Sequence, residues 1–308
     1  MKKLPFYNFL LLSLFCSCAL FGQQLSNNAN INWSAEYNEP NNSFLSDVIH
    51  STQDGFYALR IQGLGAKRDN PNIMVEYYDK AQMKLKKSAE LDLKYKKKQR
   101  DFENVIMAGS NMYFLTSFNN QAKKRNYLFA QGVNLKSLRP SQKLVKLAEV
   151  ETKNLYQEGG FRHDLSKDTS KILIYSMLPK KKKQPERFSL QVFDNQLNPL
   201  WDKEVQLPFN DEKFAVEEYK VDNDGNVYML GVIYEDKVRV RRGGSANYQY
   251  VILAYRDGGE SVEEYKINLN NKFITDLTFR VAKNGDLIFS GFYSEKGTYS
   301  VKGTYSLD

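Results

Sequence analysis

The sequence predicts an all-β fold, a β-propeller of four-stranded antiparallel blades with about five repeats. Three observations predict it. A turn followed by an apolar strand recurs along the chain, a second strand ending in Asp or Asn recurs behind it, and aromatic residues make up 13% of the sequence. Tyr and Phe favour half-buried pleated strands. No segment shows a sustained apolar period near that of a helix, so we expect little helix.

The recurring turn is the clearest part of the repeat. Asp-Gly or Asn-Gly before an apolar run indicates a tight hairpin turn, because Gly and Asn tolerate positive φ angles. A weaker copy begins at Ser110, and a fifth copy at Ser170 has lost the glycine. The three strong copies, each predicted to lead into the second strand of a blade, are DGFYAL at 54–59, DGNVYML at 224–230 and NGDLIF at 284–289.

The strand behind each turn copy ends in an acid or its amide. These residues are separated by 55, 60, 63 and 51 positions. Such periods fit one four-stranded blade per repeat. The five end residues are Asp79, Asn134, Asp194, Asp257 and Asp308.

The last repeat stops after its third strand. Residues 31–40 are a candidate for the missing strand, because Trp33 corresponds there to Trp201 of segment 199–208 and a closed ring leaves no exposed edge. An incomplete or larger ring and a sandwich-like all-β fold remain as alternatives. The predicted domain covers 23–308, with repeats at roughly 43–93, 101–150, 160–208, 214–268 and 273–308.

Residues 1–22 are predicted to be a secretory signal peptide. Lys2 and Lys3 precede an apolar run at 9–21, and the small residue Gly22 marks the expected cleavage point. The run is too short to span a membrane, and no later stretch reaches the needed length. We therefore expect an exported protein, in the periplasm, on the outer surface or outside the cell.

Both cysteines, Cys16 and Cys18, lie inside this segment. Lipidation at one of them is the alternative to plain cleavage, although the residues before them do not match a lipoprotein signal. Cleavage after Gly22 would leave a chain with no cysteine, and hence with no disulfide, thiol nucleophile or cysteine metal site.

The turns and their period resemble those of the broad class of bacterial secreted β-propeller repeat proteins, over nearly the whole mature chain. The resemblance implies a fold and no particular activity. The repeats lack the Gly-His and Trp-Asp pairs of WD40 blades, and the Gly pairs at 159–160, 243–244 and 258–259 fall at different points of the repeat, unlike those of kelch blades. Segment 51–55 does not match the spacing of a sialidase Asp-box.

We expect no catalytic residue, cofactor or metal site from the sequence. The two histidines, His50 and His163, lie at predicted strand ends and are interpreted as polar residues there. A catalytic triad needs a positioned histidine, and a zinc site needs three or four ligands. Residues 222–226 resemble a calcium loop, but Ile233 stands where the bidentate Glu is required.

Carboxylates that are neighbours in sequence make poor acid/base pairs. Glu217 and Glu218, like Glu263 and Glu264, should point to opposite faces of a strand. Propeller glycosidases use carboxylates from different blades, and a single sequence does not show such pairs.

Basic residues gather in predicted loops, and the net charge is +8. Four clusters lie between the second and third strands of successive repeats, and a fifth lies between two repeats. Both kinds of connection emerge at the same end of a blade, so the clusters should share one face and attract anions. The alternative is a set of solvated loops. The candidate anion-binding residues are Lys67, Arg68, Lys96, Lys97, Lys98, Lys123, Lys124, Arg125, Lys180, Lys181, Lys182, Lys183, Arg239, Arg241 and Arg242.

The absence of a catalytic motif predicts a non-enzymatic binding or scaffold protein of the bacterial cell envelope. Its partner would be an anionic glycan, lipid or protein at the basic face, and nucleic acid is not expected for an exported chain. Two alternatives remain, because a fold hosts many functions. One is an extracellular glycan hydrolase with carboxylates at a central channel, and the other is an N-terminal fragment of a longer surface propeller.

Overall fold

The computed structural model describes residues 38–63, 71–152, 159–179, 185–210, 213–235, 246–269, 272–295 and 301–307. Residues from Glu39 onward form one compact unit. The described residues contain strands and two short 3₁₀ turns, η1 (Gln121–Lys123) and η2 (Asp257–Gly259), and no α-helix. None of their helical segments has the length and hydropathy of a membrane span.

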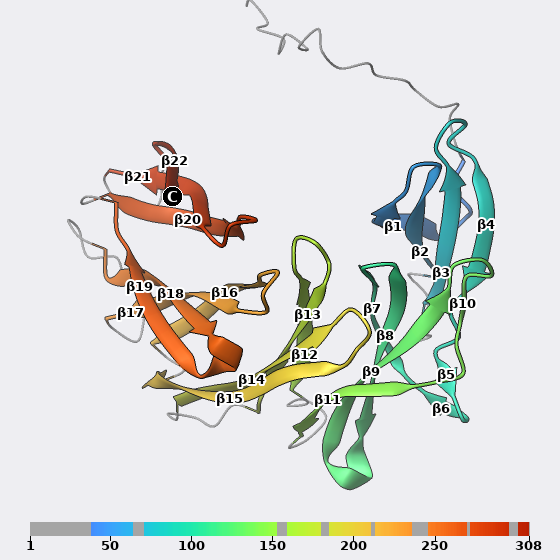
Figure 1. The fold of residues 1–308 in the computed structure, drawn as a ribbon, viewed down its shortest axis with the longest axis horizontal. Coiled ribbons are helices and arrows are strands. Elements are labelled where there is room, and N and C mark those ends of the chain that lie inside the picture. Colours follow the sequence, from blue (N-terminus) through green and yellow to red (C-terminus); the bar gives the residue numbers. More distant parts are fainter. Residues whose placement is uncertain are drawn as a thin grey trace, which may run out of the picture. The chain divides into compact units, whose positions relative to one another are not determined.

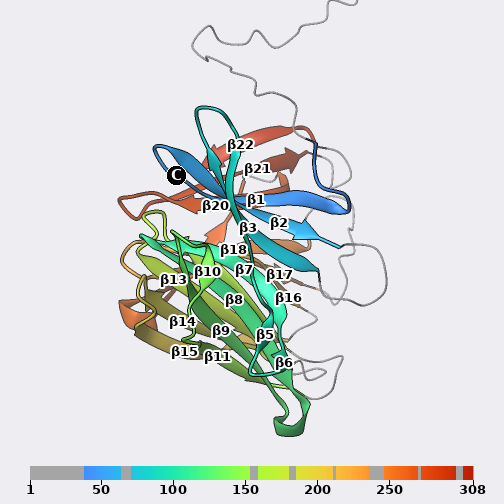
Figure 2. The ribbon, with the colours of Figure 1, turned by 90° about the vertical axis from the view of Figure 1, so that its right-hand side faces the viewer.

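Five antiparallel sheets follow one another along the chain, and we call them blades 1 to 5 (Figures 1 and 2). In each blade the strands pair in chain order, except that β10 and β11 both pair with β9. The strands are β1 (Ser43–Ser51), β2 (Gly55–Gln62), β3 (Asn72–Asp79) and β4 (Leu85–Glu90) in blade 1; β7 (Asp101–Ala108), β8 (Asn111–Asn120), β9 (Arg125–Asn134), β10 (Arg139–Pro140) and β11 (Val145–Glu151) in blade 2; β12 (Gly160–Leu165), β13 (Lys171–Met177), β14 (Pro185–Asp194) and β15 (Pro199–Asn210) in blade 3; β16 (Phe214–Val221), β17 (Val227–Tyr234), β18 (Tyr248–Arg256) and β19 (Ser261–Ile267) in blade 4; and β20 (Phe273–Val281), β21 (Leu287–Ser294) and β22 (Gly303–Leu307) in blade 5.

This architecture confirms the predicted all-β fold of four-stranded propeller blades. A separate hairpin, β5 (Lys94–Tyr95) with β6 (Lys98–Gln99), lies between blades 1 and 2. The described part of blade 5 has three strands. Most of the predicted closing segment 31–40, including Trp33, lies outside the described residues, so that prediction stands as made.

The second strand of each inner blade is buried on both faces. Side chains alternate along a strand, so consecutive apolar residues face opposite neighbours. In β17, Val227 and Met229 pack toward blade 3, whereas Tyr228 and Leu230 pack toward blade 5. Strands β8 and β13 divide their residues in the same way. Unbroken apolar runs after the turns therefore create a core between each pair of blades.

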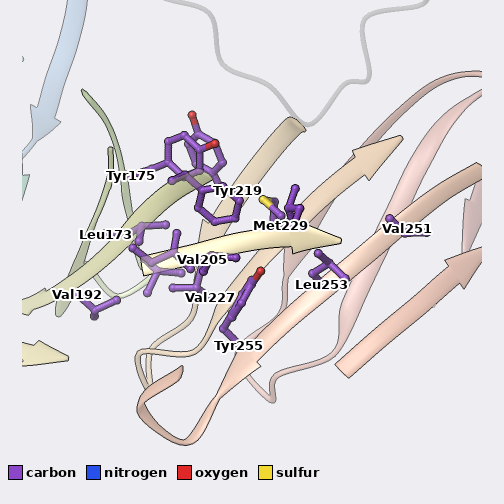
Figure 3. Packing of buried hydrophobic residues seen from close by; sticks show 14 of the residues in the cluster. Leu173, Tyr175, Val192, Val205, Tyr219, Val227, Met229, Val251, Leu253 and Tyr255 are labelled. Carbon is purple, nitrogen blue, oxygen red and sulfur yellow. The ribbon is translucent and has the colours of Figure 1, made fainter. Parts of the chain in front are cut away.

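The core between blades 3 and 4 shows this packing at close range (Figure 3). Leu173 and Val192 of blade 3 lie in the same cluster as Val227 of blade 4. The rings of Tyr175 and Tyr219 stack across the two blades, with centroids 4.3 Å apart and planes 13° apart. Such a stacked pair adds about 0.5–1.5 kcal/mol to the stabilisation from buried area.

The Asp-Gly turn before β17 is held by its own side chain. Asp222 Oδ1 accepts hydrogen bonds from the backbone N–H groups of Asp224 and Asn226, at 2.9 and 2.8 Å. Gly225 has a φ of +92°. Any residue that has a Cβ atom would be strained in this conformation. These contacts explain why the segment that resembles a calcium loop is a turn.

Replacing Gly225 by Ala is expected to lower the free energy of unfolding by about 1–2 kcal/mol, because Ala cannot adopt this φ without strain. The measurement is urea denaturation. Gly132 offers a matched control, since it has no positive φ and an added Cβ would meet its nearest neighbour, Ser141, at 4.0 Å. Equal losses from Gly225→Ala and Gly132→Ala would contradict the explanation.

Candidate active site

Polar side chains join the first strands of successive blades. Between β7 and β12, Asn104 Nδ2 lies 3.1 Å from His163 Nε2. Between β12 and β16, Asp164 Oδ2 accepts a hydrogen bond from the backbone N–H of Val221 at 2.9 Å. His163 and Asp164 are consecutive, so they point to opposite faces of β12 and reach blades 2 and 4 respectively.

The same arrangement recurs between blades 4 and 5. Glu218 Oε2 accepts hydrogen bonds from Thr278 Oγ1 at 2.9 Å and from the backbone N–H of Phe279 at 3.3 Å. Glu218 follows a β-bulge in β16, where the register shifts between Val216 and Glu218. Bulges redirect side chains and are frequent beside active sites. One oxygen of each carboxylate is thus fixed by the next blade.

The other oxygens of Asp164 and Glu218 face one ammonium group. Lys220 Nζ lies 2.9 Å from Glu218 Oε1 and 3.6 Å from Asp164 Oδ1. All three side chains are largely buried, with exposed fractions of 18% for Asp164, 19% for Lys220 and 23% for Glu218. The fold therefore brings two carboxylates from neighbouring blades into one partly desolvated cluster.

Burial raises the pKa of Asp164 above its ordinary value. The Lys220 ammonium and the Val221 N–H act in the opposite direction but do not cancel this effect. A carboxyl group with a raised pKa keeps its proton to higher pH, which is the property a general acid needs.

His163 lies next to Asp164 in β12 but points away from this cluster, toward blade 2. Burial lowers the pKa of the His163 imidazole. Asn104 Oδ1 accepts a hydrogen bond from the N–H of Val105, so its amide nitrogen is the group that faces His163 Nε2. His163 Nε2 then accepts this hydrogen bond and its proton is on Nδ1. His163 thus links two blades from within β12, whereas the sequence predicted that it lies at a strand end.

The predicted basic residues are described only in part. Lys96–Lys98 lie in the β5–β6 hairpin, and Lys123–Arg125 lie at η1 and the start of β9. The structure brings Lys96, Lys98 and Lys123 together around one hollow. The basic residues that lie outside the described parts of the chain are Lys67, Arg68, Lys180, Lys181, Lys182, Lys183, Arg239, Arg241 and Arg242.

The cluster of Asp164, Glu218 and Lys220 was missed from the sequence. The sequence pairs Glu218 only with its neighbour Glu217. No local motif joins Asp164 to Glu218, because they belong to different repeats. Among the described residues, no group of three His, Cys, Asp or Glu side chains could hold a metal ion.

No family model matches the sequence, and no curated protein matches it. Solved structures do resemble the chain, at low similarity. The acylaminoacyl peptidase of Pyrococcus horikoshii has a TM-score of 0.41 at 13% identity, over 81% of this chain and 35% of its own. A thermostable family-43 glycoside hydrolase has a TM-score of 0.38 at 15% identity, over 82% of this chain and 84% of its own.

A third similar structure is the NanB sialidase of Streptococcus pneumoniae, with a TM-score of 0.37 at 10% identity, over 77% of this chain and 36% of its own. The chain thus spans about a third of the peptidase and of the sialidase. These likenesses concern the fold alone.

The prediction of a non-enzymatic binding or scaffold protein is corrected by these findings. The three similar structures described above are named as a peptidase, a glycoside hydrolase and a sialidase. The prediction failed because it was made from an absence of local motifs, and a site assembled from several blades leaves none.

Proposed function

We propose that this chain is a glycan hydrolase whose acid/base groups are Asp164 and Glu218. The observation that carries the proposal is the cluster in which Lys220 Nζ contacts both carboxylates, each anchored through its second oxygen to the next blade. Most glycosidases need one carboxylic acid and one carboxylate on either side of the scissile bond.

The environments of the two carboxyl groups assign their roles. Asp164, whose pKa burial raises, is the general acid that protonates the glycosidic oxygen as the bond to the sugar breaks. Glu218 is the carboxylate that attacks the anomeric carbon or activates the water that does so. Either route consumes one water and yields two sugar products. Lys220, which contacts both carboxyl groups, lowers the pKa of Asp164 but does not cancel the effect of burial, and it favours the ionised form of Glu218.

Hydrolysis should be fastest at acidic pH and fall as the pH rises. Asp164 is active when protonated, and its raised pKa means that it loses this proton at a higher pH than an ordinary Asp does. The measurement is sugar release from a panel of nitrophenyl glycosides and polysaccharides across pH. An absence of release from every glycan, or release that increases through neutral pH, would contradict the proposal.

Residues 1–22, the predicted signal peptide, would bring the protein to its substrate. A signal peptide there would export the chain to the periplasm, the outer surface or the medium, where glycans are available. Mass spectrometry of the protein from the culture would test this. A chain that begins after Gly22 supports export, and a chain that retains its apolar run at 9–21 contradicts it.

A further inference from the structure

A hollow of about 560 Å³ lies on one face of blade 2, beside the β5–β6 hairpin. Aromatic rings form its floor and ammonium groups surround them. The hairpin contributes Lys96 and Lys98, and η1 contributes Lys123. The rings on the sheet are Phe118 of β8 and Tyr127 and Phe129 of β9.

Arg100, which also lines the hollow, is buried without a carboxylate partner. Its exposed fraction is 3%. Nη1 donates to Thr116 Oγ1 at 2.7 Å and Nη2 donates to the carbonyl oxygen of Asp92 at 3.4 Å, but Nε is buried with no hydrogen-bond partner. No ion pair joins it to an acid in the described part of the chain. The rings of Tyr95 and Phe114, with centroids 5.4 and 5.9 Å from Arg100 Cζ, and the charge of Asp92 offset part of the cost of burying this cation. An anion in the hollow would offset more of it.

The hairpin holds its lysines in an unfavourable backbone conformation. Tyr95 pairs with Lys98, so Lys96 and Lys97 form a two-residue loop with φ angles of 47° and 65°. Asn-Gly is the preferred sequence for a loop with two positive φ angles. Strain of this kind occurs at binding sites. Here it places Lys96 at the rim, and Lys98 Nζ lies 5.1 Å from the centroid of the Phe118 ring.

Tyr127 and Phe129 form an aromatic platform whose rings lie 6.0 Å apart, with planes 28° apart. An aromatic face packs against the apolar face of a sugar ring, and the surrounding cations suit a sugar carboxylate. A nucleic-acid strand would need several free rings along a charged groove. Here Lys98 lies over the Phe118 ring and Lys96 lies 5.5 Å from the centroid of the Tyr95 ring.

The charge of the hollow is strongly unbalanced. Glu149 is the acid among its described lining residues, and Lys146 already binds it at 2.6 Å. Arg125 lies 3.8 Å from the same carboxylate, on its other oxygen. Lys96, Lys98 and Arg100 thus have no acidic partner within the hollow. The uncompensated charge is positive, which specifies an anionic ligand.

We propose that this hollow is an accessory site that binds one carboxylated sugar unit of an acidic glycan. The sugar ring lies on Tyr127 and Phe129, and its carboxylate faces Lys96 and Arg100. The site is separate from the proposed catalytic carboxylates of blades 3 and 4. It therefore does not depend on hydrolysis.

The test compares binding of three probes to the full protein by titration calorimetry. They are trigalacturonic acid, the neutral galactose trisaccharide and a short oligothymidylate. Wild-type protein should bind the acidic trisaccharide in preference to both others. The variant Lys96→Asn/Lys98→Gln should bind it about tenfold more weakly, because two charges that face the ligand are lost.

Lys97→Gly is the matched control. It removes a lysine from the same loop, but Lys97 does not line the hollow and Gly suits its positive φ. It should retain wild-type affinity and thermal stability. Equal weakening by Lys97→Gly, or equal binding of the neutral sugar or the oligonucleotide, overturns the proposal. Glu218→Gln should leave this binding unchanged, which separates it from the hydrolase proposal.

Discussion

Replacing Glu218 by Gln is expected to lower the rate of glycan hydrolysis about 10²–10⁴-fold, the contribution of a positioned acid/base group. The amide keeps the size of the side chain, and its oxygen can still accept the hydrogen bonds from Thr278 and Phe279. The link between blades 4 and 5 should therefore survive while the carboxylate is lost. The measurement is the hydrolysis rate on the best glycan of the panel.

Asp164→Asn should give a loss of similar size, and it should also remove the fall in rate at rising pH. Glu264→Gln, on the outer strand β19, is a matched control, because Glu264 is 41% exposed and pairs only with Lys266, at 3.9 Å, among the ion pairs described. Thermal melting shows whether each variant keeps its fold. A folded Glu218→Gln variant with wild-type activity would contradict the assignment of Glu218.

Replacing Glu76 by Gln is expected to lower the free energy of unfolding by about 3–5 kcal/mol, because it removes the buried carboxylate beside the Arg60 guanidinium, whose ion pair with Glu39, at 3.7 Å, involves a carboxylate that is 45% exposed. Arg60 and Glu76 are 2% and 3% exposed, on the face of blade 1 opposite its apolar core. Arg60 Nε lies 3.0 Å from both Glu76 oxygens, and Tyr78 Oη donates to Glu76 Oε2 at 2.7 Å.

Burial, followed by the hydrogen bond to Glu76, raises the pKa of Tyr78 to about 12. Tyr78 therefore keeps its proton and remains a donor to Glu76 at neutral pH. The hydrogen-bond network of Arg60, Glu76 and Tyr78 needs the negative charge of the Glu76 carboxylate. The amide of Gln would place N–H groups beside those of Arg60. Chemical denaturation of the variant measures the loss.

An exposed ion pair supplies the control. Arg187 and Glu204 pair across β14 and β15 with exposed fractions of 41% and 56%. Glu204→Gln should cost less than about 1 kcal/mol, because water already screens the pair. The double variant Arg60→Met/Glu76→Gln should recover part of the loss from Glu76→Gln. Additive losses at Arg60 and Glu76 would contradict the role assigned to this pair.

The sequence was sufficient for the blades because their signals are local. The turn at Asp222–Asn226 and the apolar run that begins at Val227 act within one hairpin. Strong copies of this short-range pattern recur in blades 1 and 5, and weaker ones in blades 2 and 3. The sequence was not sufficient to predict which neighbouring blade each buried side chain contacts. An unbroken apolar run is consistent with any strand that is buried on both faces. The core clusters show which blade each of its side chains contacts.

The candidate sites depend on contacts that span repeats. Neither Asp164 nor Lys220 belongs to a motif in its own strand. The sequence also does not show how close the first strands of adjacent blades lie. The sequence predicted that the basic loops share a face. It did not predict the hollow, because the rings of Tyr127 and Phe129 meet the buried Arg100 only where β9 lies beside the β5–β6 hairpin.

By itself the sequence determined the strands, the turns and the period of this protein, because backbone preference and side-chain alternation act over a few residues. The tertiary structure alone decided which acids meet. Asp164 and Glu218 face one ammonium because successive blades place their first strands side by side, and burial in that position gives the Asp164 carboxyl the raised pKa of a proton donor.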